Sequence, residues 1–191
     1  MTESETIARW VAPGARVLDL GCGDGTLLRH LWQARQAPGY GVEIDDAKVL
    51  ECIRNDVNVL QMDLEDGLAA FADQSFDSVI LSETLQAIRH QELLLREMLR
   101  VGREAIVSFP NFGYWRARIQ IALAGHMPVS KELPYQWYDT PNVHHCTLID
   151  FEDLCAKLGL RILERVVLHD GNPASVLPNL LGSLAIYRVS A

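Results

Sequence analysis

The sequence predicts an α/β fold in which helices cover both faces of a doubly wound, mostly parallel sheet. Strand-like and helix-like runs alternate through the first 110 residues, a rhythm typical of βαβ units. The predicted strands are nearly continuous apolar runs, as expected when both faces of a sheet are buried. A glycine-rich turn joins the first strand to the first helix, where many such sheets bind a ligand.

The length and composition predict one globular domain, residues 1–191, that is neither membrane-bound nor a nucleic-acid binder. The chain is 49% hydrophobic and 22% charged, which are ordinary globular values. Its net charge of −8 argues against binding to a phosphate backbone. No apolar run is long enough for a membrane span, and the start, MTESETIARW, does not read as a signal peptide. We therefore expect a cytoplasmic protein.

The four cysteines predict neither a metal site nor a thioredoxin-like motif. Cys22, Cys52, Cys146 and Cys155 form no C-x-x-C pair, and we expect no bound metal. In a reducing compartment they would act as small buried hydrophobic residues.

The elements of the parallel half follow from apolar runs and their spacing. A helix is expected near the start of the chain, before Trp10. The predicted strands are Arg16–Leu20, Gly39–Ile44, Val57–Met62, Phe76–Ser82 and Glu104–Phe109. The predicted helices between them are Gly25–Ala34, Asp46–Arg54 and Gln91–Val101.

An aromatic-rich insert at about 111–146 interrupts this rhythm. Tyr114–Ala124 is predicted as a helix, and Gly125–Val143 as an irregular stretch rich in Pro, Tyr and Trp. The insert is too long for a bare connection, and such segments are usually lids or binding elements.

The chain then returns to regular structure. A helix is predicted over Ile149–Leu158, begun by a capping box at Thr147 and ended by Gly159. Arg161–Leu168 and Leu184–Val189 are predicted as two final strands, for which antiparallel pairing is one expected arrangement.

The glycine turn indicates the class of ligand. Gly21, Gly23 and Gly25 form a G-x-G-x-G pattern between a strand and a helix, where backbone amides are free to face a ligand. Dinucleotide-binding turns favour G-x-G-x-x-G instead. Asp19 precedes the turn, and its carboxylate suits an ammonium group but would repel a pyrophosphate.

Two later strands end in residues that suit a nucleoside. Glu43 lies near the end of the second strand, where a carboxylate can accept hydrogen bonds from a ribose diol. Met62 ends the third strand and Asp63 follows it, where an adenine could be held. A nicotinamide dinucleotide is the less favoured alternative.

These motifs resemble class I S-adenosylmethionine (SAM)-dependent methyltransferases through VLDLGCGDG, GVEID and QMD. The resemblance implies a Rossmann-like sheet of seven mostly parallel strands with an antiparallel C-terminal hairpin. It implies SAM or S-adenosylhomocysteine as the cofactor, with Asp19 near its methionine part, Glu43 on the ribose and Asp63 near adenine N6. The candidate binding residues are Asp19, Gly21, Cys22, Gly23, Asp24, Gly25, Glu43, Ile44, Met62, Asp63, Leu64 and Ser82.

No residue stands out as catalytic. The fourth strand is followed by SETLQAI and lacks the Asn/Asp-Pro-Pro-aromatic motif of amino-group methyltransferases. Glu83, Tyr114 and His144 are candidates for a proton acceptor or substrate contact. Each has a plain structural alternative: capping the next helix, lid packing, or capping a turn.

Longer stretches resemble the methionine biosynthesis protein MetW family across nearly the whole chain. They are APGARVLDLGCGDG at 12–25, FPNFGYWRARIQ at 109–120, LPYQWYDTPNVHHCTLIDFEDLC at 133–155 and the terminal NLLGSLAIY. The resemblance implies partnership with homoserine O-acyltransferase, whose acetyl or succinyl transfer such proteins support. A regulatory SAM-binding subunit is therefore the favoured hypothesis, and a methyltransferase acting on a small molecule is the alternative.

Overall fold

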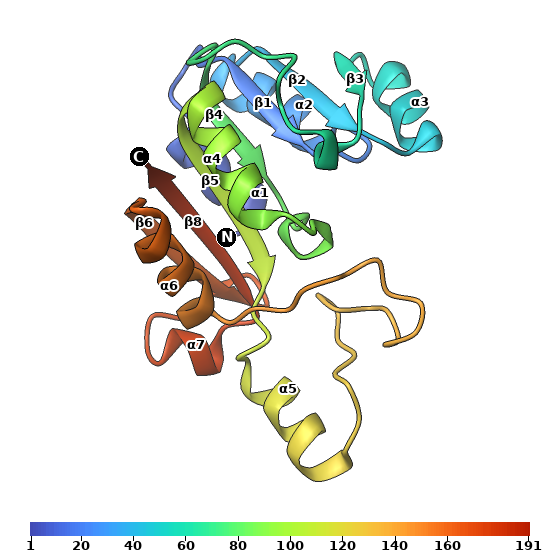
Figure 1. Ribbon diagram of the computed structural model, residues 1–191, viewed down its shortest axis with the longest axis vertical. Coiled ribbons are helices and arrows are strands. Elements are labelled where there is room, and N and C mark those ends of the chain that lie inside the picture. Colours follow the sequence, from blue (N-terminus) through green and yellow to red (C-terminus); the bar gives the residue numbers. More distant parts are fainter.

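The computed structural model describes residues 1–191 and contains one eight-stranded sheet (Figure 1). The strands lie in the order β3-β2-β1-β4-β5-β8-β6-β7. Their bounds are β1 Val17–Leu20, β2 Gly39–Glu43, β3 Val59–Gln61, β4 Phe76–Leu81, β5 Gly102–Pro110, β6 Arg161–His169, β7 Asn172–Pro173 and β8 Leu184–Ser190.

The pairing confirms the predicted doubly wound sheet. β1 to β5 pair in parallel, and the order reverses between β1 and β4, where β1 lies between β2 and β4. β8 inserts antiparallel between β5 and β6, so the last long strands do pair antiparallel. The expected seven strands are present, and the two-residue β7 adds an eighth at the edge.

Seven α-helices accompany the sheet, five of them close to their predicted positions. They are α1 Glu3–Trp10, α2 Thr26–Arg35, α3 Asp46–Arg54, α4 Gln91–Val101, α5 Trp115–Ile119, α6 Leu148–Leu158 and α7 Pro178–Leu181. α5 is shorter than predicted, and the four-residue α7 was not predicted. None of the helices is long and apolar enough to cross a membrane.

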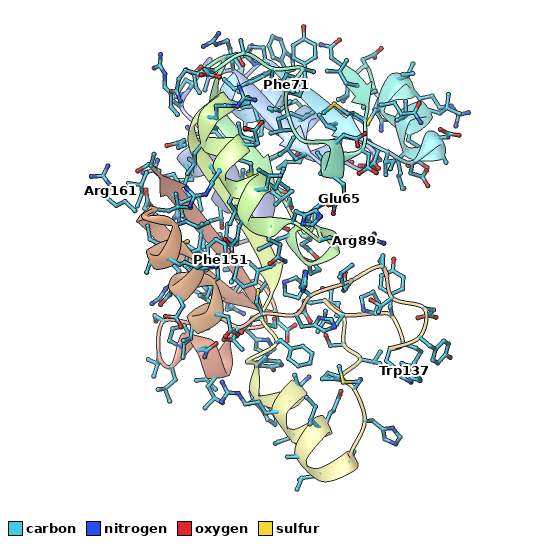
Figure 2. The ribbon with its side chains drawn as sticks, viewed as in Figure 1. Glu65, Phe71, Arg89, Trp137, Phe151 and Arg161 are labelled. Carbon is cyan, nitrogen blue, oxygen red and sulfur yellow. The ribbon has the colours of Figure 1, made fainter.

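Each face of the sheet carries its own hydrophobic core because side chains alternate along a strand. Val79 and Leu81 of β4 lie in the core beneath α4 and α6, whereas Ile80 lies in the core beneath α1, α2 and α3. Phe151 of α6 points into the first core and packs on Phe109, with ring centroids 5.0 Å apart (Figure 2).

The helix boundaries follow capping chemistry. Thr2 and Glu5 form a capping box that begins α1, and Thr147 and Asp150 form the predicted one that begins α6. Gly159 ends α6 with φ +73°, as predicted.

The insert leaves the body of the molecule at the end of β5 (Figure 1). The predicted helix over Tyr114–Ala124 is wrong in its second half, because residues Gln120–Ala124 form a π-helix that continues α5. The chain then runs without a helix or strand until α6. Its return is anchored at Gln86, whose carbonyl accepts hydrogen bonds from the amides of Val143 and His144.

Candidate functional site

The glycine loop after β1 has the backbone that its sequence predicts. Gly21, Gly23 and Gly25 all have positive φ, at 70°, 57° and 79°. A Cβ on Gly21 would lie 2.6 Å from Thr84 Oγ1, and one on Gly25 would lie 2.8 Å from a methyl group of Val57. A Cβ on Gly23 would meet nothing within 4 Å. The outer two glycines therefore permit packing, and Gly23 alone presents bare backbone to open space.

Glu43 at the end of β2 holds this loop in place. One carboxylate oxygen accepts the amide of Gly23 at 2.9 Å, and the other accepts the amides of Ile44 and Asp45 at 2.8 and 3.0 Å. A carboxylate offers about four lone-pair sites, so one remains for a ligand hydroxyl. The structure thus brings Glu43 to the glycine loop, a contact that the sequence did not predict.

Asp19 is a buried carboxylate without a partner. Its side chain is 1% exposed, and neither oxygen accepts a hydrogen bond. Burial, together with the nearby charges of Glu3 and Glu43, raises the pKa of Asp19 to about 7. A buried carboxylate in this state is unsatisfied, and a cationic group beside it would lower its pKa and stabilise its charge.

Glu3 is a member of this site that sequence reasoning missed. Its carboxylate accepts a hydrogen bond from Ser82 Oγ at 2.7 Å and a second from Ser108 Oγ. Glu3 begins α1, and 79 and 105 residues separate it from these serines. The capping motif at Thr2 predicts a helix start, but only the folded chain places that start over β4 and β5.

The residues expected near an adenine lie beside Glu43. Met62 donates its amide to the carbonyl of Glu43 at 3.1 Å, and Asp63 accepts the amide of Glu65 at 2.9 Å. This second bond begins a 3-10 turn, Leu64–Asp66. Met62 and Leu64 are half-buried, and Ile44 is exposed.

The remaining loop residues support the backbone. Asp24 accepts the amide of Thr26 at 3.0 Å, which lowers the pKa of Asp24. The thiols of Cys22 and Cys52 lie 3.7 Å apart, and Cys52 donates to the carbonyl of Gly23. Burial raises the pKa of both thiols. All four cysteines are free, and three are buried, as predicted; Cys146 is half-buried.

Glu83 is the candidate with the most unusual environment. It follows β4 with φ +46°, a left-handed conformation that few non-glycine residues adopt. Burial, and then the charge of Glu3, raises the pKa of Glu83 to about 7. Such a value suits a group that exchanges a proton near neutral pH.

Tyr114 belongs to a network of hydrogen-bonded polar side chains where the insert leaves β5. Its hydroxyl is 3.2 Å from Nε2 of His169, whose Nδ1 is 3.4 Å from Ser183 Oγ. Ser183 donates to Glu132 at 2.9 Å. These four side chains help to line a cavity of about 180 Å³. Sequence reasoning missed the other members of the network because 55 residues separate Tyr114 from His169 and 51 separate Glu132 from Ser183.

The third candidate, His144, lies where the insert returns to the body of the protein at Gln86. Its ring contacts the carbonyl of Arg89 at 3.4 Å, and its side chain is exposed. Its neighbour His145 stacks on Phe112, with ring centroids 4.8 Å apart, and burial lowers the pKa of His145. Neither histidine caps α6, because Thr147 does so.

The strand order and the glycine loop define a Rossmann-like methyltransferase fold. The chain is 18% identical to a structure of the Haloferax volcanii Trm112 methyltransferase activator in complex with a methyltransferase, at a TM-score of 0.71, covering 98% of this chain and 88% of that one. It is 13% identical to a SAM-dependent methyltransferase from Aquifex aeolicus, at a TM-score of 0.68 and the same coverage. These identities establish the fold alone.

The family follows from closer matches. The profile described as "Methionine biosynthesis protein MetW" matches residues 2–189, and the chain belongs to that family. The "Bifunctional methionine biosynthesis protein MetXA/MetW" of Rhodopirellula baltica is 40% identical over 173 residues. The match covers 86% of this chain and 28% of that protein, so the chain spans under a third of its relative's length.

Proposed function

We propose that this methionine biosynthesis protein binds SAM at the carboxyl ends of β1 to β4 and acts as an activating subunit of homoserine O-acyltransferase. The residues present fit the cofactor. Gly23 leaves space for close approach, and the unpartnered carboxylate of Asp19 suits a ligand that carries an ammonium and a sulfonium. Glu43 retains a free acceptor site for a ribose hydroxyl, and Met62 and Asp63 would border the adenine.

The roles of the chain's own residues in this site are binding and orientation. SAM supplies an activated methyl group when bound. Glu43 ties β2 to the glycine loop, so the loop is already formed before a ligand arrives. Glu3 closes the site over Ser82 and Ser108 and adds negative charge on the side that would face the cation.

The partnership rests on one observation, the fused relative. In the R. baltica protein, a segment like this chain shares one polypeptide with a part named MetXA. Fusion keeps two proteins at a high effective concentration, which suits proteins that act together. With SAM as a distant product of methionine synthesis, a SAM site on the companion subunit could report end-product level to the acyltransferase.

Acyltransferase turnover tests this function directly. The rate of the homoserine O-acyltransferase is measured with and without this chain, each with and without SAM, using acetyl and succinyl donors. We expect the chain to raise the rate several-fold and SAM to change that effect, which requires a coupling of about 1–3 kcal/mol. If the chain neither raises the rate nor co-elutes with the enzyme, the proposal is wrong.

The environment of Glu83 favours a second candidate function, methyl transfer to a small molecule. A strained carboxyl with a pKa of about 7, next to the SAM site, could accept a proton from a hydroxyl or carboxyl acceptor. Sustained release of S-adenosylhomocysteine with a metabolite mixture, abolished in Glu83→Gln, would support this function. Absence of turnover in the wild type would leave only the regulatory role.

A further inference from the structure

A groove of about 230 Å³ opens where α5, α6 and α7 meet. Its walls are apolar and come from Leu148, Ile149, Leu177, Pro178 and Leu180. The groove lies beyond β5 on the α6 side of the sheet, whereas the glycine loop follows β1 (Figure 1). The SAM site therefore does not account for it.

Leu177 and Ile149 expose large apolar side chains at this groove, and Leu177 also has an unfavourable backbone conformation. Leu177 is 63% exposed and has φ +44°, a conformation that costs a branched residue about 1–2 kcal/mol. Ile149 is 56% exposed in the first turn of α6. Asn or Gly would occupy position 177 with less strain. A strained, exposed leucine contributes little to the core, and this points to a role on the surface.

The groove is also held rigidly. Asn111, which is 3% exposed, donates to the carbonyls of Asn179 and Gly182 at 3.1 and 2.8 Å. Asn179 in turn accepts the amide of Leu148 at 3.2 Å. A Cβ on Gly182 would lie 2.1 Å from a methyl group of Val167, so α7 packs tightly on β6. The FPNF and NLLG stretches thus build this groove, and its shape is preorganised.

The charge at the rim defines the complementary partner. Arg118 forms no ion pair; its Nε donates to the carbonyl of Gly113, which leaves the outer guanidinium nitrogens free. The other rim charges, Arg165 and Glu152, already pair with each other at 2.6 Å. One helical turn before Arg118, Trp115 adds an exposed aromatic ring. The surface therefore suits an apolar side chain flanked by a carboxylate.

We propose that this groove, with Trp115 and Arg118, is the surface on which the homoserine O-acyltransferase docks, through an apolar side chain next to an acidic one. The proposal rests on the proposed function. A buried apolar centre with a polar rim, and anchors of Trp and Arg, is the usual anatomy of a protein interface. The fused relative supplies the occupant, because its MetW-like segment shares one polypeptide with a part named MetXA.

Two variants of the full chain test the groove. Leu177→Asn removes the apolar side chain and suits the left-handed backbone, so it should raise the midpoint of thermal unfolding. Ile149→Glu places an acidic residue in the first turn of α6, where it is tolerated. Titration calorimetry with the acyltransferase should show each variant binding about tenfold more weakly or worse. Leu50→Gln on α3, where the leucine is 53% exposed, is the matched control and should bind like the wild type.

The outcomes separate the groove from the function. If the wild type binds and activates the enzyme but both groove variants bind equally well, the groove proposal is overturned and the proposed function stands. It is also overturned if Trp137→Ser on the outer loop, and not the groove variants, breaks the complex, or if the groove variants change only self-association in sedimentation. If the wild type itself forms no complex, the proposed function fails first.

Discussion

The glycine-loop region and the region around the insert are held together over different sequence distances. In the first, Glu43 reaches Gly23 across 20 residues and Cys52 reaches Cys22 across 30. In the second, Asn111 reaches Gly182 across 71 residues and Tyr114 reaches His169 across 55. The first region is a succession of βαβ units, and the second joins three distant segments at one edge of the sheet.

The two regions also differ in how far their side chains are exposed to solvent. Asp19 is buried and Glu43 half-buried beside the glycine loop, where Gly23 presents its backbone to open space. The insert instead exposes large apolar side chains over its whole length, with Trp137 at 72% exposure on the outer loop, pointing away from the sheet (Figure 2). We interpret the first region as the cofactor site and the second as the protein-binding side of the molecule.

The largest expected effect is loss of SAM binding in Gly23→Val. A Cβ here meets nothing in the protein, so the folded chain bears only backbone strain, whereas the ligand would collide with the side chain. Titration calorimetry should show SAM affinity falling by more than about a hundredfold, or ~3 kcal/mol. Gly159→Val, at φ +73° with equally open space, carries the same strain far from the site and should bind SAM normally. Normal binding by Gly23→Val would mean that the ligand lies elsewhere.

Asp19→Asn should weaken SAM binding by about 1.5–3 kcal/mol, because a charge-assisted contact is lost. For the wild type we expect SAM affinity to rise with pH through about 7, since a cationic ligand prefers the ionised carboxylate. The stability of the ligand-free protein should instead decrease as the pH rises. The pKa of Asp19 in the folded protein lies well above that of an unburied aspartate, so the contribution of Asp19 to stability falls as pH rises from about 4 to 7.

A pH series of calorimetric titrations and thermal scans distinguishes the two effects. Asp19→Asn should flatten the pH dependence of binding and should raise the stability of the ligand-free protein at pH 8 by about 1–2 kcal/mol. A wild-type SAM affinity that does not change between pH 6 and 8 would show that Asp19 stays out of contact with the cation.

Asn111→Ala tests the second region with a smaller effect. It removes two hydrogen bonds to the carbonyls of Asn179 and Gly182 and one from the amide of Gly113; the bond to Asn179 is part-buried and the other two are buried. Denaturant unfolding should show a loss of about 2–3 kcal/mol. SAM affinity should stay within twofold of the wild type, because this network does not touch the glycine loop. An equal loss of SAM affinity would show that the two regions are coupled.

Trp137→Ser should produce the smallest change in stability. The ring is 72% exposed and contacts Tyr138 edge to face, so its removal should cost less than about 0.5 kcal/mol in chemical unfolding. A loss above about 2 kcal/mol would mean that the outer loop packs against the body of the protein in solution.

Motifs with local physical causes were predicted from the sequence. The glycine turn, the capping box at Thr147 and the apolar strands each depend on a few neighbouring residues, and all appear where expected. The π-helical end of the α5 segment and the turn of α7 were not predicted. No periodicity distinguishes a π-turn from an α-turn, and α7 depends on Asn111, some 70 residues away.

The amino-acid sequence alone determined the fold class, the alternation of strands and helices along the chain and the position of the loop that would bind SAM. Short-range patterns encode these features, because burial on both sheet faces and positive φ at glycine constrain residue types directly. Only the tertiary structure placed Glu3 over Ser82 and Ser108, left Asp19 buried without a partner, and brought Ile149 and Leu177 to one groove. Those features depend on contacts between segments far apart in the chain, and the packing of the sheet decides them.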